Sequence, residues 1–449
     1  MPQKTHFKKK LFKDDKKLRV CFSAEQLNLM ASTAELIKRD RKFTLWALIS
    51  VMVFGKDKSY QVSLTEKCQH LFDLGIIITK QGLDKRLNNK AALFLKGVLE
   101  NLLNLKLVNN LPNQILKNFK GIFVIDATSF QLPDNLATTY KGSGGGSTNS
   151  GIKTHYMVDI SSKGDTGLEF THTASSDTTT QLIKPKKGFL YLFDLGYVTF
   201  KRLLNIQSES AFYLCRMSFN PIVWIKSEKG YEQLKWAEQI KKMREGQIKE
   251  LSVFLGKEKN VESRLVIEKV PQKIADEKRR KLKTDKVNKR KSISKERLAY
   301  CDLNAYITNA TAKQLSSTDA RAVYGLRWQI EIYFKTWKSY MNIDKIRNMN
   351  IDRFNCTHYG TLIYIILTSK IFFYLKYTHW NKKGVELSEL KAMKYFSDRK
   401  LELEELLFGS AKRANLLWEA TIANITFNCI KERKYNQLTP YEVIQSCLS

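Results

Sequence analysis

Apolar residues follow two different spacings along this chain, and the spacing changes near residue 121. Before that point they recur every three or four positions over 24–37 and 93–107, as on one face of a helix. From 121 to 218, short apolar runs rich in β-branched residues alternate with polar loops, which is typical of strands. Helical spacing returns after about residue 320 and continues to the end. The pattern predicts an α/β core between helical N- and C-terminal regions.

Strands are predicted at 121–128, 152–160, 168–175, 188–197 and 211–218. The second and third are expected to be neighbours in a hairpin or meander, and 178–183 is expected to be a short helix. The first strand is apolar as far as Asp126, and the fourth is apolar as far as Asp194. An aspartate is therefore predicted at the end of each of these two strands.

An insertion is predicted at about 219–305. It contains the strand-like pieces IVWIK, ELSVFLG and SRLVIEKV, followed by a very basic stretch from Lys273 to Arg297. Such a stretch is expected to be solvated and mobile, and its functional interpretation is phosphate contact. An apolar strand then resumes over 299–310.

The stretch 322–340, AVYGLRWQIEIYFKTWKSY, contains no Pro, and its one Gly is near the start, so a single helix is predicted. At about 100° per residue, four polar side chains fall within roughly 60° of arc. These are Tyr324, Arg327, Glu331 and Lys338. The other side should face a core and carries Leu326, Ile330, Tyr333, Phe334 and Trp337. An acid flanked by phosphate-binding groups suits chemistry on a nucleic-acid backbone; the alternative is a solvated face of an amphipathic helix.

Charge sharpens this hypothesis. The chain carries 76 Lys plus Arg against 44 Asp plus Glu, a net charge of +32. This excess indicates a polyanion as the partner, with DNA or RNA as the first candidate. A membrane surface is the second candidate, but no lipidation motif accompanies the charge. The alternative is a basic enzyme whose charge has no such role. The N-terminus is a basic arm without the apolar region of a secretory signal. The apolar stretch 359–377 is interrupted by Lys370 and Lys376, which favours a buried helix over a membrane span.

The seven cysteines include no C-x-x-C and accompany no His cluster with metal spacing, so neither a zinc site nor a disulfide framework is indicated. A cytoplasmic location with reduced thiols follows.

The chain contains two further motifs. A helix over 63–74, a turn at Gly75 and a second helix from Thr79 resemble a helix-turn-helix, although an ordinary helical subdomain has the same pattern. The second helix would expose Lys80, Gln81, Lys85 and Arg86. The Gly-rich loop 142–151 fails the P-loop pattern, because Ile152 intervenes before Lys153 and a strand follows. It is expected to be a flexible loop near DNA.

Asp126 and Asp194 at strand ends, with Glu331 on a helix, form a candidate metal site. Hard cations such as Mg²⁺ prefer carboxylate oxygens, and two such ions suit an in-line displacement at phosphorus. The alternative for any strand-end aspartate is a cap or turn. Rivals in the same region are Asp159, Asp165 and Asp177.

The helix matches the Y-x2-R-x3-E-x6-K signature of the IS-four group of DDE insertion-sequence transposases at all four positions. The segment Asp194–Tyr197 resembles that family's second-aspartate region, and Val124–Thr128 resembles its first. GSGGGSTNSGIKTH resembles the segment between the two. The resemblance covers about 121–340 in the family's order.

The resemblance implies an RNase H-like mixed-sheet catalytic core with a β-rich insertion between the second Asp and the Glu helix. It implies Asp126, Asp194 and Glu331 as the catalytic, metal-binding triad, with Mg²⁺ (or Mn²⁺ in its place) bound as two ions. Tyr324, Arg327 and Lys338 would contact DNA phosphates. In relatives a Trp of the insertion stacks on a flipped base; Trp224 and Trp236 are available here, and neither is assigned.

The expected organisation has five parts: 1–118 with the basic arm, the possible helix-turn-helix at about 63–90 and binding of DNA ends; 119–218, first part of the core; 219–305, insertion; 306–380, second part of the core; and 381–449, helical with a possible dimer contact. The expected partners are double-stranded DNA, at element ends and target, and a second copy of the chain in the synaptic complex, with no membrane and a nucleoid-associated, cytoplasmic location. The expected activity is cleavage at terminal inverted repeats and joining of the 3′ ends to target DNA. The alternatives are a catalytically silent DNA-binding regulator and an RNase H-like nuclease of another purpose.

Overall fold

A computed structural model describes residues 16–36, 43–55, 62–107, 116–144, 149–161, 166–241, 243–288, 292–433 and 437–448. The predicted basic arm before residue 16, the middle of the Gly-rich loop (145–148) and Asp165 lie outside the described residues.

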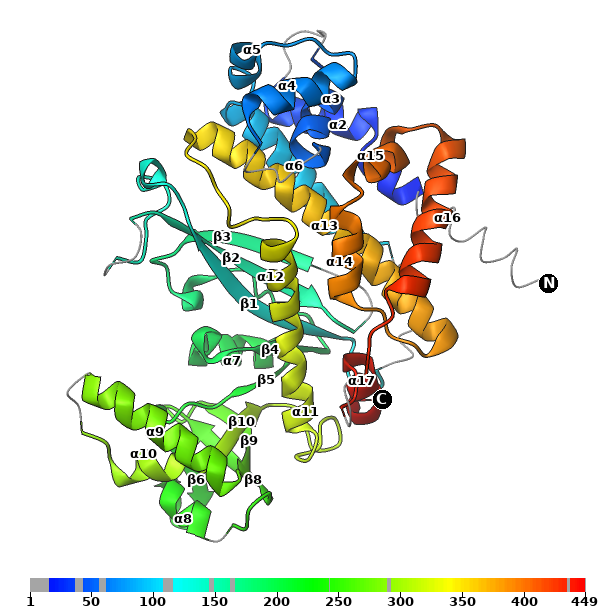
Figure 1. Ribbon diagram of the computed structural model, residues 1–449. Coiled ribbons are helices and arrows are strands. Elements are labelled where there is room, and N and C mark those ends of the chain that lie inside the picture. The colour runs from blue at the N-terminus through cyan, green and yellow to red at the C-terminus, as the bar shows by residue number, and fades with distance from the viewer. Residues whose placement is uncertain are drawn as a thin grey trace. The chain divides into compact units, whose positions relative to one another are not determined.

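Within the described residues, ten strands form one mixed sheet (Figure 1). In spatial order they are β3 (Thr166–His172), β2 (Gly151–Asp159), β1 (Gly121–Gln131), β4 (Phe189–Phe193), β5 (Phe212–Arg216), β10 (Leu303–Thr308), β9 (Val261–Lys269), β8 (Ile248–Leu255), β6 (Val223–Ser227) and β7 (Gly230–Gln233). The predicted α/β class is confirmed, and the three strand-like pieces of the insertion are β6, β8 and β9.

The centre of the sheet is parallel. β1 pairs with β4, and β4 with β5, in parallel register, whereas β10 runs antiparallel to both β5 and β9. Residues 122–125 of β1 and 190–193 of β4 are fully buried. Continuous apolar runs are what strands buried on both faces require, which explains why GIFVI and FLYLF fold here.

The chain divides into two compact units. Unit 1 comprises Met1–Pro112, Ala127–Ser175 and Ile330–Gln437; unit 2 comprises Asn113–Asp126, Ser176–Gln329 and Leu438–Ser449.

Unit 1 is mainly helical. Its N-terminal helices are α2 (Ala24–Thr33), α3 (Leu45–Ile49), π-helix η1 (Ser50–Phe54), α4 (Leu64–Asp73), α5 (Lys80–Asp84) and α6 (Asn89–Asn104). Its later helices are α12 (Gln329–Ser339), α13 (Ile351–Lys383), α14 (Glu389–Ser397), α15 (Lys400–Phe408) and α16 (Ala411–Asn428). α13 packs against α6 and is buried along most of its length, so the prediction of a buried helix over 359–377 is confirmed. No helix within the described residues is long and apolar enough to cross a membrane.

The helix pair suggested as a helix-turn-helix is present as α4 and α5. Ser63 caps α4 with a full capping box, and Gly75 makes the turn with a positive φ of 77°. The second helix is only five residues long. Lys80, Gln81 and Lys85 are exposed, while Arg86 is half-buried and donates to the Gly82 carbonyl at 2.9 Å. A DNA-reading role for this pair stays a prediction.

Unit 2 contains the short helices η3 (Asp177–Thr179), η4 (Leu195–Tyr197), α8 (Trp236–Lys241), α10 (Lys295–Tyr300), α11 (Ala320–Gly325) and η5 (Leu326–Trp328). Its longer helices are α7 (Phe200–Ser208), α9 (Gln272–Asn288) and α17 (Pro440–Leu448). The prediction of a helix over 178–183 was wrong. A 3₁₀ turn ends at Thr179, and no helix follows it before residue 183. The strand expected from residue 299 begins only at Leu303, after α10.

The prediction of a mobile basic stretch was also wrong for its described part, because residues 272–288 form α9 and 295–300 form α10. Lys and Arg are good helix formers, and the helix is tied to β10 and the turn before it. Lys278 Nζ donates to the Leu303 carbonyl at 3.0 Å, and Arg279 forms an ion pair with Asp302.

Candidate active site

Asp126 and Asp194 lie side by side where the parallel pairing of β1 with β4 ends. The prediction that the first strand ends near Asp126 was wrong, because β1 continues to Gln131. Ile125 of β1 is the register partner of Phe193 of β4, and each aspartate is the next residue in its strand direction. Because neighbouring strands are about 4.8 Å apart and paired positions face the same way, both carboxylates leave one face of the sheet. Both side chains are half-buried. The structure therefore brings these two predicted site residues together.

Tyr324 and Arg327 each contact one of the two aspartates. The Tyr324 hydroxyl donates to Asp194 Oδ1 at 3.3 Å, and Arg327 Nη1 donates to Asp126 Oδ2 at 2.7 Å. Burial, together with the charge of Asp194, raises the pKa of Tyr324 well above its ordinary value. The phenol therefore stays protonated and acts as a donor.

The predicted single helix over 322–340 is divided into α11, the 3₁₀ turn η5 and α12. Tyr324 is the last residue but one of α11, and Arg327 lies within the 3₁₀ turn. The tighter winding of three residues per turn changes the angle between these two side chains from the ideal helical value.

Arg216 belongs to the same group of residues and was missed from the sequence. Cys215 of β5 is the register partner of Phe193, so Arg216 continues the row formed by Asp126 and Asp194. Its guanidinium lies 5.9 Å from the centre of the Tyr324 ring. The available signal was the same as for the aspartates, because Arg216 is the first charged residue after the apolar run AFYLC.

Glu331 and Lys338 lie on α12, in unit 1. The buried side of this helix packs on Tyr156 of β2, whose ring centre is 4.9 Å from that of Trp337 and 6.1 Å from that of Tyr333. The predicted core side is confirmed, since all five of its residues are buried. Glu331 and Lys338 are half-exposed, and Lys338 Nζ lies 3.5 Å from the Ser129 carbonyl of β1.

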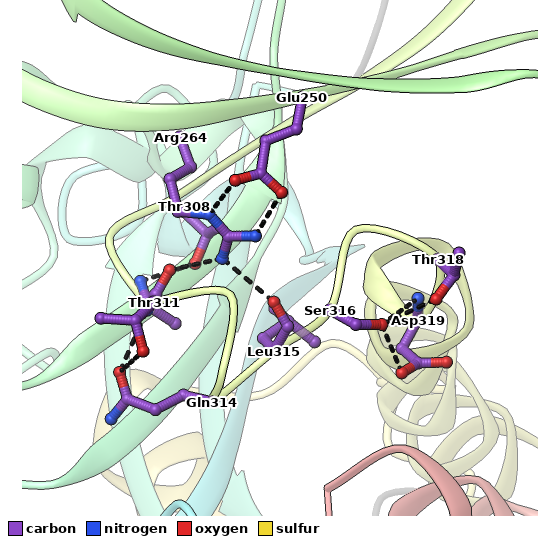
Figure 2. Close-up of polar contacts among 10 residues, drawn as sticks. Glu250, Arg264, Thr308, Thr311, Gln314, Leu315, Ser316, Thr318 and Asp319 are labelled. Carbon is purple, nitrogen blue, oxygen red and sulfur yellow. Dashed lines mark hydrogen bonds and ion pairs between the residues drawn. The ribbon is translucent and has the colours of Figure 1, made fainter.

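An arginine of the insertion holds the loop that leads into α11 (Figure 2). Arg264 of β9 binds Glu250 of β8 through two hydrogen bonds of 2.7 and 2.5 Å. Its Nη1 also donates to the carbonyls of Ala310 and Leu315, at 2.5 and 3.0 Å. Both carbonyls belong to residues 309–319, the connection from β10 to the helix that bears Tyr324. The insertion thus fixes the start of that helix.

The other named candidates have structural partners. The Trp224 indole donates to the Gly256 carbonyl at 2.9 Å, and Trp236 packs edge-on against Tyr300 at 4.8 Å. Asp159 accepts from the Ser161 amide and hydroxyl in a buried turn. Asp177 lies against Gly196, where an added Cβ would come within 2.9 Å of its Oδ2.

The donor chemistry of Asp126 and Asp194 suits a hard divalent cation, because the two residues offer carboxylate oxygens at neighbouring positions, in β1 and directly after β4. Asp194 precedes η4 without making a side-chain capping bond, which leaves its carboxylate to Tyr324. Across the described ranges, no three His, Cys, Asp or Glu side chains are arranged to hold a metal ion. The pair of aspartates therefore fits a divalent metal by its chemistry, and the addition of Glu331, which belongs to the other unit, stays a prediction.

Comparison with known families matches the model described as "Transposase DDE domain" to residues 117–366, more than half of the chain. The chain belongs to the DDE transposases. Its relatives place it with the insertion-sequence transposases of the IS-four group.

The relatives align over nearly their whole length. The transposase for insertion sequence element IS231F of Bacillus thuringiensis subsp. israelensis is 29% identical over 440 residues, covering 94% of this chain and 92% of that protein. The transposase for IS1151 of Clostridium perfringens is 27% identical over 467 residues and is covered to 97%, as is this chain. A solved piggyBac transposase synaptic complex with hairpin DNA aligns with 93% of this chain and 84% of its own, at 11% identity and a TM-score of 0.42.

Proposed function

We propose that this chain is the transposase of an insertion sequence. In this proposal it binds the terminal inverted repeats of the element, cleaves the DNA by metal-dependent phosphodiester hydrolysis, and joins the 3′ ends to target DNA by transesterification. Family membership and the names of the relatives support the general activity.

The observation that carries the proposal is the pair Asp126 and Asp194, which accept hydrogen bonds from a guanidinium and a phenol, respectively. Register places the two acids on neighbouring parallel strands, and Tyr324 and Arg327 reach them at 3.3 and 2.7 Å. Parallel β1, β4 and β5 beside an antiparallel β10 support an RNase H-like core.

The DDE transposase family generally uses divalent metal ions. In the proposal, Asp126, Asp194 and Glu331 would hold Mg²⁺ or Mn²⁺, as two ions. The bound metal supplies Lewis-acid activation at the phosphodiester. Tyr324, Arg327 and Lys338 would bind and orient the phosphates, and their hydrogen bonds and positive charge favour the negative charge that develops on oxygen.

The remaining assignments are proposals of the same kind. The region 1–118, with α4 and α5, would bind the element ends, and the helices after residue 381 would contribute to a homodimer that holds two ends. A protein with a net charge of +32 that binds double-stranded DNA would associate with the nucleoid.

The test is a cleavage assay on DNA that carries the gene with its native flanks. Wild-type protein should cut at both element ends in Mg²⁺ and not in EDTA, and Asp194→Ala should abolish cutting while leaving DNA binding largely intact. Asp134→Ala, at an exposed acid in the 3₁₀ turn after β1 (Asp134–Leu136), is the matched control and should cut like wild type. Full cleavage by Asp194→Ala would overturn the assignment.

The two alternatives give different results in the same assay. A silent regulator would bind the ends without cutting them in any metal. An RNase H-like nuclease of another purpose would cut without regard to the element ends.

A further inference from the structure

A pocket of about 290 Å³ opens beside the aspartate row, entirely within unit 2. Its wall begins at Leu195, the residue after Asp194, and includes Arg216, the third member of the row. The insertion supplies Phe219, Lys278, Arg297 and Tyr300. Three cations and two aromatic rings therefore line one small cavity, and its lining includes no carboxylate.

The three cations of the pocket are described by their partners. None of them forms an ion pair with a carboxylate in the part of the chain that the structure describes. Lys278 Nζ donates to neutral partners, the Leu303 carbonyl at 3.0 Å and Asn304 Oδ1 at 2.9 Å. Burial, and then the charge of Arg216, lowers the pKa of Lys278. The pocket thus concentrates positive charge that an anion would relieve.

Arg297 is placed for a ligand. Its guanidinium lies 5.2 Å from the centre of the Phe219 ring, and Nη1 donates to Asn220 Oδ1 at 3.1 Å. Its Nε is buried and has no hydrogen-bond partner among the described residues. An acceptor that enters the pocket and reaches Nε would supply the hydrogen bond that this donor lacks.

We propose that this pocket binds a backbone phosphate of an unpaired DNA strand, with the deoxyribose against Phe219 and Tyr300. The proposal rests on the proposed function, because it takes the strand to be the one held at Asp194. A volume of about 290 Å³ is at the lower end of ligand pockets, which span roughly 300–1,000 Å³, and accommodates one nucleotide unit but not a duplex. A cationic site with aromatic walls suits a single strand.

A free nucleotide offers the same phosphate chemistry, so the experiment must separate the two sources. The probe is a single-stranded thymidylate octamer, with a duplex of equal length and thymidine monophosphate as comparators. Binding is measured by fluorescence anisotropy over a series of salt concentrations, without divalent metal, so that the result does not depend on cleavage.

Arg297→Gln removes one cation of the pocket, and Arg297→Lys keeps the charge. Arg244→Gln is the matched control, because Arg244 is an exposed cation of the same insertion outside the pocket lining. One lost phosphate contact on a single strand lowers the slope of log K against log salt by about 0.7, which corresponds to about fourfold weaker binding at 0.15 M salt. Melting curves identify any variant that fails to fold.

We expect Arg297→Gln to show this loss on the octamer and a smaller loss on the duplex, while Arg297→Lys and Arg244→Gln keep the wild-type slope. Millimolar thymidine monophosphate should not displace the octamer. Equal slopes for Arg297→Gln and Arg244→Gln would overturn the proposal, as would an equal loss on duplex. Displacement by the monophosphate that disappears in Arg297→Gln would reassign the pocket to a free nucleotide. Failure of the cleavage assay alone would overturn the proposed function and leave this result unaffected.

Discussion

Arg264→Ala tests whether the insertion positions the helix that bears Tyr324 and Arg327. The substitution removes both hydrogen bonds to Glu250 and both bonds to the carbonyls of Ala310 and Leu315. The loop 309–319 would then lose its attachment to β9. We expect faster local opening of this loop and weaker cleavage.

The size of the expected effect depends on how far the contacts of Arg264 are exposed to solvent. The side chains of Arg264 and Glu250 are 16% and 34% exposed, so solvent weakens their ion pair, and the two carbonyl bonds dominate. Hydrogen bonds to a charged donor contribute about 1.5–3 kcal/mol each, and their effects overlap. A local loss of about 3 kcal/mol corresponds to roughly 100-fold faster opening.

Hydrogen exchange followed by mass spectrometry on peptides spanning 309–319 measures this opening, with cleavage measured in parallel. Arg413→Ala is the control, since Arg413 pairs with Glu405 at 3.0 Å but both side chains are about half exposed, 54% and 43%. That change should alter stability by less than about 0.5 kcal/mol. Wild-type exchange and full cleavage in Arg264→Ala would refute the positioning role.

Two buried groups predict how stability depends on pH. Burial lowers the pKa of His358 to about 3. Below about pH 6.5 this imidazole is therefore protonated in the unfolded chain and still neutral in the folded chain. The free energy of unfolding should therefore fall by about 2 kcal/mol from pH 7 to pH 5 because of His358. Urea titration of His358→Leu at the two pH values should not show this decrease. Burial alone would raise the pKa of Glu389, but Lys376 and Lys431 outweigh it and bring the value to about 2. Its contribution is therefore present above about pH 4.5 and lost as the pH falls towards 2. Glu389→Gln should lower the midpoint of urea titration at pH 7, but by less than the about 3–5 kcal/mol of an isolated buried pair, because Glu386 stays paired with both lysines; an unchanged midpoint would contradict this.

The positions of the two aspartates were predictable because central parallel strands are buried on both faces. Their sequences are continuous apolar runs, so the first charged residue after each run marks the end of the buried part. Asp126 and Asp194 were located in this way, and the same rule applied to AFYLC would have included Arg216. The two aspartates are neighbours because β1 pairs with β4 in this register. The pairing joins distant segments of the chain, so the local sequence pattern does not predict it.

Other features depend on tertiary partners. The 3₁₀ turn at Leu326–Trp328 is invisible in the pattern, since three residues at 3.0 per turn drift little from helical spacing. The basic stretch was expected to be mobile because its charge suggests solvation, yet Lys278 and Arg279 have partners in β10 and at Asp302. The Arg264 attachment joins residues 14 to 51 positions apart, beyond the reach of any periodicity.

The ion pair between Arg327 and Asp126 has a consequence for folding. Carboxylates on neighbouring strand ends repel one another, and a protein that relied on a bound cation to screen them would be unstable during synthesis, before any cation is loaded. Arg327 provides a covalently attached counter-charge at 2.7 Å, and the Tyr324 phenol adds a proton donor to Asp194. Arg327 and Tyr324 therefore offset part of this repulsion from within the protein, so that folding does not depend on the proposed metal ions.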